Sequence, residues 1–175
     1  MADLVTIVGP LASGKNTVAT RLTELLERSG ESCAVVDVDD VADMVRARGA
    51  SPSWLWPTAH EIHGELVARW LASAVNVVVA VGNIYDEAEQ RALEASLPEH
   101  VRALRVVLDA PIDVTWARAT DDPTRGASRE RDFHERAHAR FRELLPRIPA
   151  DVTLDTGTLS PEESARAILA ALPRP

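Results

Sequence analysis

The amino-acid sequence predicts an α/β fold in which one five-stranded parallel sheet is covered by helices on both faces. Short β-branched runs alternate along the chain with segments of helical periodicity, which is typical of this class. A second observation is the glycine-rich loop at Gly9–Thr17, which stands between the first such run and the first helical segment. The predicted strands are Leu4–Val8, Ala34–Val38, Val77–Val81, Arg105–Leu108 and Val152–Leu154.

Helices are predicted where apolar residues recur every three or four positions. The first follows the glycine-rich loop, and the last begins at the capping box Ser160–Glu163, which has proline at its first helical position. A further helix is predicted over Asp132–Leu145. In the helix predicted over Thr58–Ala74, the stripe expected to face the core is formed by Ile62, Leu66, Trp70 and Ala74, with Val67 and Leu71 beside it.

Length and composition restrict the classes of protein to which the chain can belong. A mass of 19.0 kDa fits one domain spanning 1–175. The net charge of −8 and the pI near 5.1 weigh against a general affinity for nucleic acids. The single cysteine, Cys33, cannot form an internal disulfide, and the N-terminus lacks the features of a secretory signal. Because the longest apolar run, Val77–Val81, is far shorter than the ~20 residues that span a bilayer, we expect a cytoplasmic protein with no membrane partner.

The loop at Gly9–Thr17 has the composition of loops that wrap nucleotide phosphates. Lys15 is the only lysine of the chain, whereas the 18 other Lys or Arg positions are arginine. Base composition explains why lysine is scarce, but not why the single one stands in this loop. A strand before the loop and a helix after it aim backbone N–H groups and the positive end of a helix dipole at one point. The residues expected to bind the nucleotide are Gly9, Leu11, Ala12, Ser13, Gly14, Lys15, Asn16 and Thr17, and Lys15 is also expected to be catalytic.

Three aspartates follow the second predicted strand, at the sheet edge where open α/β sheets bind ligands. In an extended segment Asp37 and Asp39 project to the same side, whereas Asp40 is expected only to cap a helix. We assign Asp39 as the base or acceptor anchor and Asp37 to a magnesium ion, with exchange of the two roles as an alternative. All three could instead be turn and capping residues. The usual hydroxyl after the lysine is replaced by Asn16, and the Gly-Lys-x-Thr form resembles adenylate kinases and related small kinases, which implies Thr17 as the other magnesium candidate.

Nearly the whole sequence resembles the group of shikimate, gluconate and nucleoside-monophosphate kinases, and it is also similar to chloramphenicol phosphotransferases. The resemblance is carried by Gly9–Thr17, by the pair in Asp37–Asp39, by an arginine-rich segment after the fourth strand and by Leu154–Thr156. It implies the P-loop fold of these kinases, with ATP and Mg²⁺ as cofactors, and it supports metal and acceptor contacts for the two aspartates. It also places Thr156 in the adenine-side loop, although a plain turn explains this residue almost as well.

A mobile lid is predicted at approximately 119–132, where arginines stand among turn residues. Closing such a lid would bring guanidinium groups onto the transferring phosphoryl group. The resemblance places Arg118 near the adenine and Arg125 near the phosphates, and we expect Arg125 to be catalytic. Arg129 and Arg131 are candidates for contact with the acceptor, with a solvated charged helix as the alternative for both.

The acceptor is expected to bind at approximately 38–75, as in the kinases that the sequence resembles. Trp54 and Trp56 stand out in a chain with 4% aromatic residues. They form either an acceptor pocket, part of the core or a dimer contact.

Two features of shikimate kinases are missing, namely a triple-glycine turn after the third strand and an Arg-Pro-Leu-Leu lid. The chain has Val81–Asn83 and Arg125–Ser128 in these places, so shikimate itself is not the expected acceptor. Gly82, Asn83 and Tyr85 are the acceptor-facing candidates after the third strand.

Together these residues predict an ATP-dependent phosphotransferase that moves the γ-phosphoryl group to a hydroxyl of a small molecule, either a metabolite or an antibiotic. A nucleoside-monophosphate kinase is the alternative nearest in chemistry. A nucleotide-binding regulatory ATPase is a second alternative, which the lack of an acidic residue in Ala80–Gly82 at the end of the third strand disfavours. The acidic charge balance weighs against a third, a polynucleotide-end kinase. GTP in place of ATP, and a homodimer in place of a monomer, remain alternatives.

Overall fold

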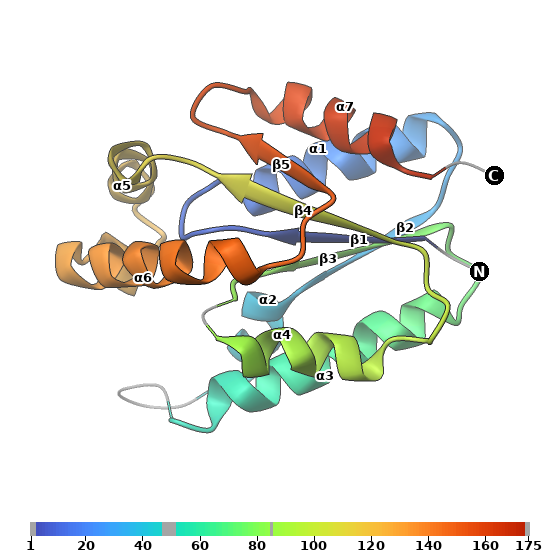
Figure 1. The fold of residues 1–175 in the computed structure, drawn as a ribbon, viewed down its shortest axis with the longest axis horizontal. Helices are drawn as coiled ribbons and strands as arrows, with labels where there is room; N and C mark the ends of the chain where they lie inside the picture. Colours follow the sequence, from blue (N-terminus) through green and yellow to red (C-terminus); the bar gives the residue numbers. More distant parts are fainter. Residues whose placement is uncertain (1–2, 47–51, 85, 174–175) are drawn as a thin grey trace.

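The computed structural model describes residues 3–46, 52–84 and 86–173, and its five strands form one parallel sheet (Figure 1). The strand order is β2-β3-β1-β4-β5, so the first strand lies at the centre. The predicted α/β class and the five predicted strands are confirmed. The strands are β1 (Asp3–Val8), β2 (Cys33–Asp37), β3 (Val77–Gly82), β4 (Ala103–Asp109) and β5 (Val152–Asp155).

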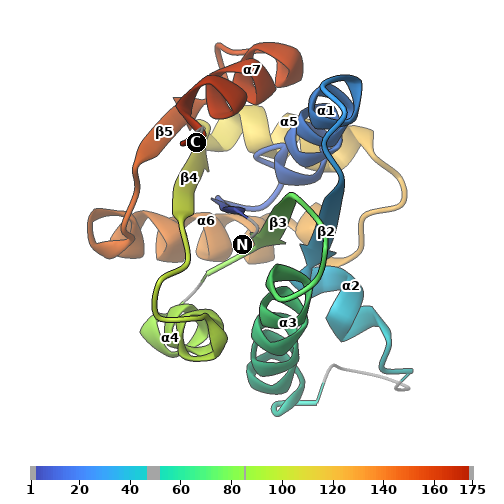
Figure 2. The same cartoon turned by 90° about the vertical axis from the view of Figure 1, so that its right-hand side faces the viewer.

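Helices cover both faces of the sheet (Figures 1 and 2). α1 and α7 lie on one face, α3 and α4 lie on the other, and α5 and α6 lie toward the edge where the strands end. Within the described ranges, no helix combines the length and the apolar character needed to cross a membrane. The helices are α1 (Lys15–Arg28), α2 (Val38–Asp43), α3 (Leu55–Leu71), α4 (Glu87–Ser96), α5 (Ile112–Asp121), α6 (Arg131–Leu144) and α7 (Pro161–Ala171), with 3-10 turns η1 (Ala127–Arg129) and η2 (Leu145–Arg147).

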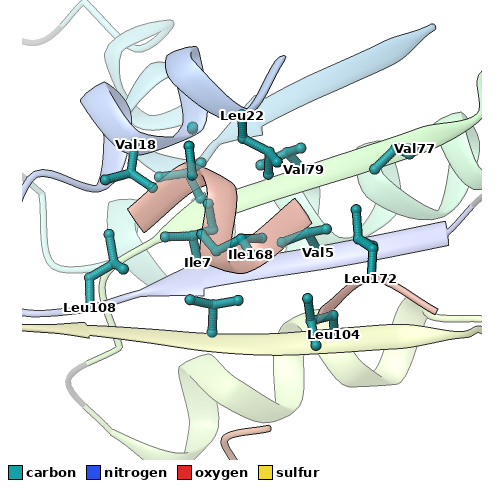
Figure 3. Close-up of a cluster of buried hydrophobic side chains, with 14 of the residues drawn as sticks. Val5, Ile7, Val18, Leu22, Val77, Val79, Leu104, Leu108, Ile168 and Leu172 are labelled. Atoms are coloured by element: carbon teal, nitrogen blue, oxygen red, sulfur yellow. The ribbon is translucent and has the colours of Figure 1, made fainter. Parts of the chain in front are cut away.

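The sheet separates two apolar cores, because alternate residues of a strand point to opposite faces. In β1, Val5 and Ile7 pack with α1 and α7 (Figure 3), whereas Leu4 packs with α3. Val18 from α1 and Ile168 from α7 close the first core. Burial on both faces fixes β1, and with it the start of the glycine-rich loop.

Two short helices, α4 and α5, were not predicted by apolar periodicity. Each has ten residues, and α4 has no buried residue, so the sequence shows too few turns for a period to emerge. A helix was expected to follow Asp40, but α2 begins earlier, at Val38. The predicted capping box at the start of α7 is confirmed, since Ser160 and Glu163 each bond the backbone N–H of the other.

The predicted core face of α3 is wrong. Ile62 and Trp70 are 41% and 45% exposed, whereas Val67 and Leu71 are buried against the sheet. Ala74 lies beyond the last residue of the helix and is exposed. The rest of the buried side is formed by Leu55, Ala59, His60, His63 and Gly64.

Polar contacts and one close approach explain how α3 buries this side. The Nε2 atom of His63 lies 3.0 Å from the carbonyl oxygen of Val36 in β2. His60 also finds carbonyl partners, so neither imidazole is left unsatisfied by burial. Gly64 lets α4 approach closely, because a Cβ there would lie 2.8 Å from the carbonyl oxygen of Ala92.

Candidate active site

The glycine-rich loop joins the carboxyl end of β1 to α1, at the middle of the sheet edge. Gly14 is the N-cap of α1 with a φ of 93°, and Ala12 is also left-handed with a φ of 56°. A left-handed residue other than glycine is uncommon, and such strained positions cluster at functional sites. The first amides of α1 have no acceptor within the helix, so with the helix dipole they form an anion-binding concavity.

Lys15 is buried beneath this loop, with 8% of its surface exposed. Its Nζ atom donates to the carbonyl oxygens of Gly9 and Pro10, both at 3.1 Å. Burial lowers the pKa of Lys15 to about 8, although the carboxylates of Asp39 and Asp37 act in the opposite direction. Burial disfavours the charged form of Lys15, and an anion bound in the loop would stabilise that charged form again.

A cleft of about 200 Å³ opens beside the loop. Arg118 from α5, Arg125 from the predicted lid and Thr156, which follows β5, meet there, so the structure brings together three candidates from separate parts of the sequence. Leu159 and Pro161, which the sequence did not single out, add apolar lining at the start of α7. The loop contributes Ala12, Ser13, Gly14 and Thr17, and α1 contributes Val18.

Thr156 ties three parts of this cleft together. Its hydroxyl lies 2.8 Å from the carbonyl oxygen of Ser13 in the loop and 3.2 Å from that of Asp109 at the end of β4. The guanidinium of Arg118 donates to the carbonyl oxygen of Thr156 at 2.6 Å. The side chain of Arg118 is therefore fixed at the cleft by β5 instead of extending into solvent.

The cleft gathers positive charge and unsatisfied donors. Arg125 forms an ion pair with Asp122, with 3.2 Å between Nε and Oδ2. Its positive charge also contributes to the lowered pKa of Lys15. The hydroxyl of Ser13 is buried and has no hydrogen-bond partner among the described residues. These groups fit a polyanion such as a nucleotide triphosphate tail.

The extended geometry expected after the second strand is not found. α2 begins at Val38, and Asp37 is its N-cap, with Oδ1 accepting the backbone N–H of Asp39 at 2.9 Å. Asp40, which was expected to be the cap, is exposed on the first turn. A cap must stand directly before the helix with its side chain turned back to the N–H groups, and only Asp37 meets this condition.

Asp37 and Asp39 nevertheless lie on the loop side of α2. Asn16 donates to Oδ2 of Asp37 at 2.7 Å, which joins the start of α1 to the start of α2. Burial raises the pKa of both carboxyl groups, and for Asp39 the charge of Asp37 raises it further. The hydroxyl of Thr17 and these carboxylates offer oxygen ligands for a metal ion. This ligand set fits Mg²⁺, which proteins commonly bind through one or two carboxylates together with substrate phosphates.

Arg129 and Arg131 lie apart from the cleft lining. Arg129 is exposed in η1. Arg131 forms an ion pair with Glu135, and its guanidinium carbon lies 4.9 Å from the ring centre of Trp116. These contacts match the solvated-helix alternative, and the sequence reasoning missed Trp116, whose position in α5 carries no motif.

Among the candidates for acceptor binding, Trp54 and Trp56 are 54% and 39% exposed, so core packing does not account for them. The residue between them, Leu55, is the one that packs against α2. His60 connects this end of α3 to the end of β3, because its ring nitrogens lie 2.9 Å from the carbonyl oxygen of Trp56 and 3.1 Å from that of Asn83.

The turn after β3 stands close to α2. A Cβ on Gly82 would lie 3.2 Å from Cγ1 of Val38, so the chain passes tightly beside the residue that precedes Asp39. The side chain of Asn83 is buried, and its Oδ1 atom has no partner among the described residues. Tyr85 lies outside the described residues.

Known structures with a similar fold can be superposed on almost the entire chain. Shikimate kinase from Acinetobacter baumannii in complex with shikimate has a TM-score of 0.63 and 22% identity, covering 97% of this chain and 92% of that chain. The Deinococcus radiodurans tunicamycin resistance protein has a TM-score of 0.64 and 21% identity, covering 97% and 95%. The Mycobacterium tuberculosis APS kinase in complex with AMPPNP and APS has a TM-score of 0.63 and 17% identity, covering 97% and 96%.

No curated protein shows significant sequence similarity to the chain. A family model described as an AAA domain matches residues 4–144, which include the glycine-rich loop, Asp37, Asp39 and the predicted lid. This match and the likeness in fold point to the same architecture. The chain belongs to this AAA domain family and has the P-loop fold found in small kinases.

Proposed function

We propose that the protein is a kinase that transfers the γ-phosphoryl group of ATP to a hydroxyl of a small molecule. The observation that carries this proposal is the cleft in which the loop, Arg118, Arg125 and Thr156 converge beside Lys15. Similar folds in proteins named shikimate kinase and APS kinase support it, the latter in complex with AMPPNP.

The nucleotide would bind along the cleft. Loop amides and Lys15 hold the β and γ phosphates, and Arg125 offsets charge that develops on the transferring group. Arg118 and Thr156, which are joined by a hydrogen bond, would lie on the adenine side. Thr17 and Asp37 would hold Mg²⁺, which when bound neutralises charge on the phosphates.

Asp39 would accept the proton of the acceptor hydroxyl while the hydroxyl oxygen bonds to the γ phosphorus. The bond from that phosphorus to the bridging oxygen breaks, and ADP leaves. The raised pKa of Asp39 makes its carboxylate a stronger base than an exposed aspartate. Trp54, Trp56, Gly82 and Asn83 are the proposed boundary of the acceptor pocket, and an acceptor role for Arg129 or Arg131 requires movement of the lid segment.

A screen for acceptor-dependent ADP release tests the proposal. Lys15→Ala should abolish release, and Asp39→Asn should lower the rate by about 10²- to 10⁴-fold because the general base is lost. Asp40→Asn is the matched control, since that aspartate is exposed on the same helix and should leave the rate unchanged. Calorimetry that detects no magnesium-dependent nucleotide binding, or full activity of Asp39→Asn, would contradict the proposal.

A further inference from the structure

Exposed apolar side chains come mostly from one stretch of the chain. Eight large apolar side chains of the described residues are exposed, and all but Phe133 on α6 come from the stretch that runs from β2 to the end of α3. A concentration of this kind on a folded surface marks an interaction site more often than a chance distribution does. The seven are Val35, Met44, Val45, Trp54, Trp56, Ile62 and Trp70.

Part of this surface is a continuous stripe on α3. Ile62, Leu66 and Trp70 recur every four residues, so they lie on one side of the helix. Leu66 is half-buried and packs against both the α2 cluster and the core beneath the sheet, while Ile62 and Trp70 are 41% and 45% exposed. Figure 2 shows α3 at the rim of the molecule between α2 and α4, with no helix or strand of the described residues outside it. We call the stripe and its charged neighbours Glu61, Glu65 and Arg69 the outer face of α3.

The charges of this outer face have no partners within the described chain. Glu61, Glu65 and Arg69 are exposed and form no ion pair there. Glu65 and Arg69 have the i, i+4 spacing that commonly pairs, and α4, α6 and α7 each form an ion pair at this spacing. The side chains on α3 are therefore available to another molecule.

The order of these residues makes the outer face complementary to itself. If two copies of α3 cross antiparallel at Leu66, Ile62 of each copy meets Trp70 of the other. Glu65 of each copy then lies near Arg69 of the other, because the acidic residues come first in the helix and the basic residue comes last. A two-fold interface requires such a patch, in which each contact occurs twice. Two chains of net charge −8 repel each other, and opposite charges at the contact would offset part of this repulsion.

We propose that the outer face of α3 is the interface of a symmetric homodimer of this chain. α3 has 17 residues and is about 25 Å long, which is enough for a helix pair with a buried central stripe. Trp70 is the anchor of the contact, as tryptophan commonly is in protein interfaces. The interface is independent of the proposed phosphotransfer, since its exposed residues Ile62 and Trp70 do not line the cleft at the glycine-rich loop.

Sedimentation velocity of the full chain over a concentration series tests the interface. The wild-type protein should sediment as a dimer, and Trp70→Ser should raise the dissociation constant at least about tenfold. Glu65→Arg and Arg69→Glu should each weaken the dimer, because each places like charges across the contact. The double variant Glu65→Arg/Arg69→Glu should restore the dissociation constant to within about threefold of the wild type, since the pairs re-form with reversed sign.

Phe133→Ser is the matched control, because it removes the exposed apolar side chain that lies outside this surface and should leave the dissociation constant unchanged. Thermal unfolding of every variant separates loss of the dimer from loss of the fold. A monomer at all concentrations overturns the proposal. A dimer that is unaffected by Trp70→Ser, or one that the double variant does not restore, overturns it as well.

Discussion

Single residues of the glycine-rich loop are fixed by contacts that the sequence does not display. Gly9 was predicted only as a residue of the phosphate-binding loop, and the structure shows why this position has no side chain. A Cβ there would lie 2.2 Å from the carbonyl oxygen of Leu108 and 2.7 Å from Oγ of Ser13. The loop therefore rests directly on the backbone of β4, which leaves no room for a side chain.

Gly9→Ala should destabilise the fold by about 2 to 3 kcal/mol, because the added methyl group meets a backbone atom that cannot rotate away. Nucleotide affinity should fall with it, since the loop must shift. Urea denaturation and calorimetry measure the two effects. Gly126→Ala is the control for stability, because a Cβ there has no atom within 4 Å. Equal losses in the two variants would show that the contact with β4 is unimportant.

At the scale of secondary-structure elements, strands and loops with a clear local pattern are predictable from the sequence. The rotation of a helix about its axis is not, when it depends on contacts with distant segments. The strands and the loop could be predicted because β-branched runs and glycine spacing are local signals. The rotation of α3 could not, because its buried side contains His60 and His63, whose carbonyl partners belong to other segments. The residues of the candidate site also fall into those that the sequence could locate and those that depend on packing. Arg118 lines the cleft beside the loop, whereas the contact of Arg131 with Trp116 depends on how α5 and α6 pack.

The packing of α5, η1 and α6 depends on a buried histidine that the sequence reasoning missed. His134 is fully buried, with Nδ1 3.1 Å from the carbonyl oxygen of Ser128 and Nε2 2.9 Å from the hydroxyl of Thr115. Its ring also meets the edge of Trp116. One side chain on α6 thus holds both α5 and η1.

His134→Leu should lower the free energy of unfolding by about 2 to 4 kcal/mol, because it leaves buried polar groups without partners and disturbs the aromatic contact. Chemical denaturation measures the change. Arg136→Ala, on an exposed side of the same helix, should change the stability by less than about 0.5 kcal/mol. A loss as small as that of the control would show that His134 does not join the three elements.

At the scale of the whole molecule, buried histidines govern how stability changes with pH. Burial lowers the pKa of His63 and His134 below the ordinary 6.5. Below pH 6.5 the unfolded chain binds protons on these rings that the folded chain does not, so the free energy of unfolding decreases as the pH falls. Nearer pH 4, the raised pKa values of Asp37 and Asp39 act in the opposite direction, because there the folded chain binds more protons.

Urea denaturation between pH 5 and pH 7.5 should therefore show stability decreasing toward acid. The double variant His63→Gln/His134→Gln should be less stable at neutral pH and should show a shallower dependence, since the two titrating rings are gone. His100→Gln, at an exposed position, should keep the wild-type slope. An unchanged slope in the double variant would mean that other groups govern the acid limb.

The bond between Thr156 and Ser13 joins positions 143 residues apart. During synthesis the glycine-rich loop leaves the ribosome early, but the threonine that braces it emerges only with the last strand. A nascent chain therefore carries the complete phosphate motif long before that motif is held in its final form. Capture of nucleotide should accordingly come late, as one of the closing events of folding, instead of nucleating the fold.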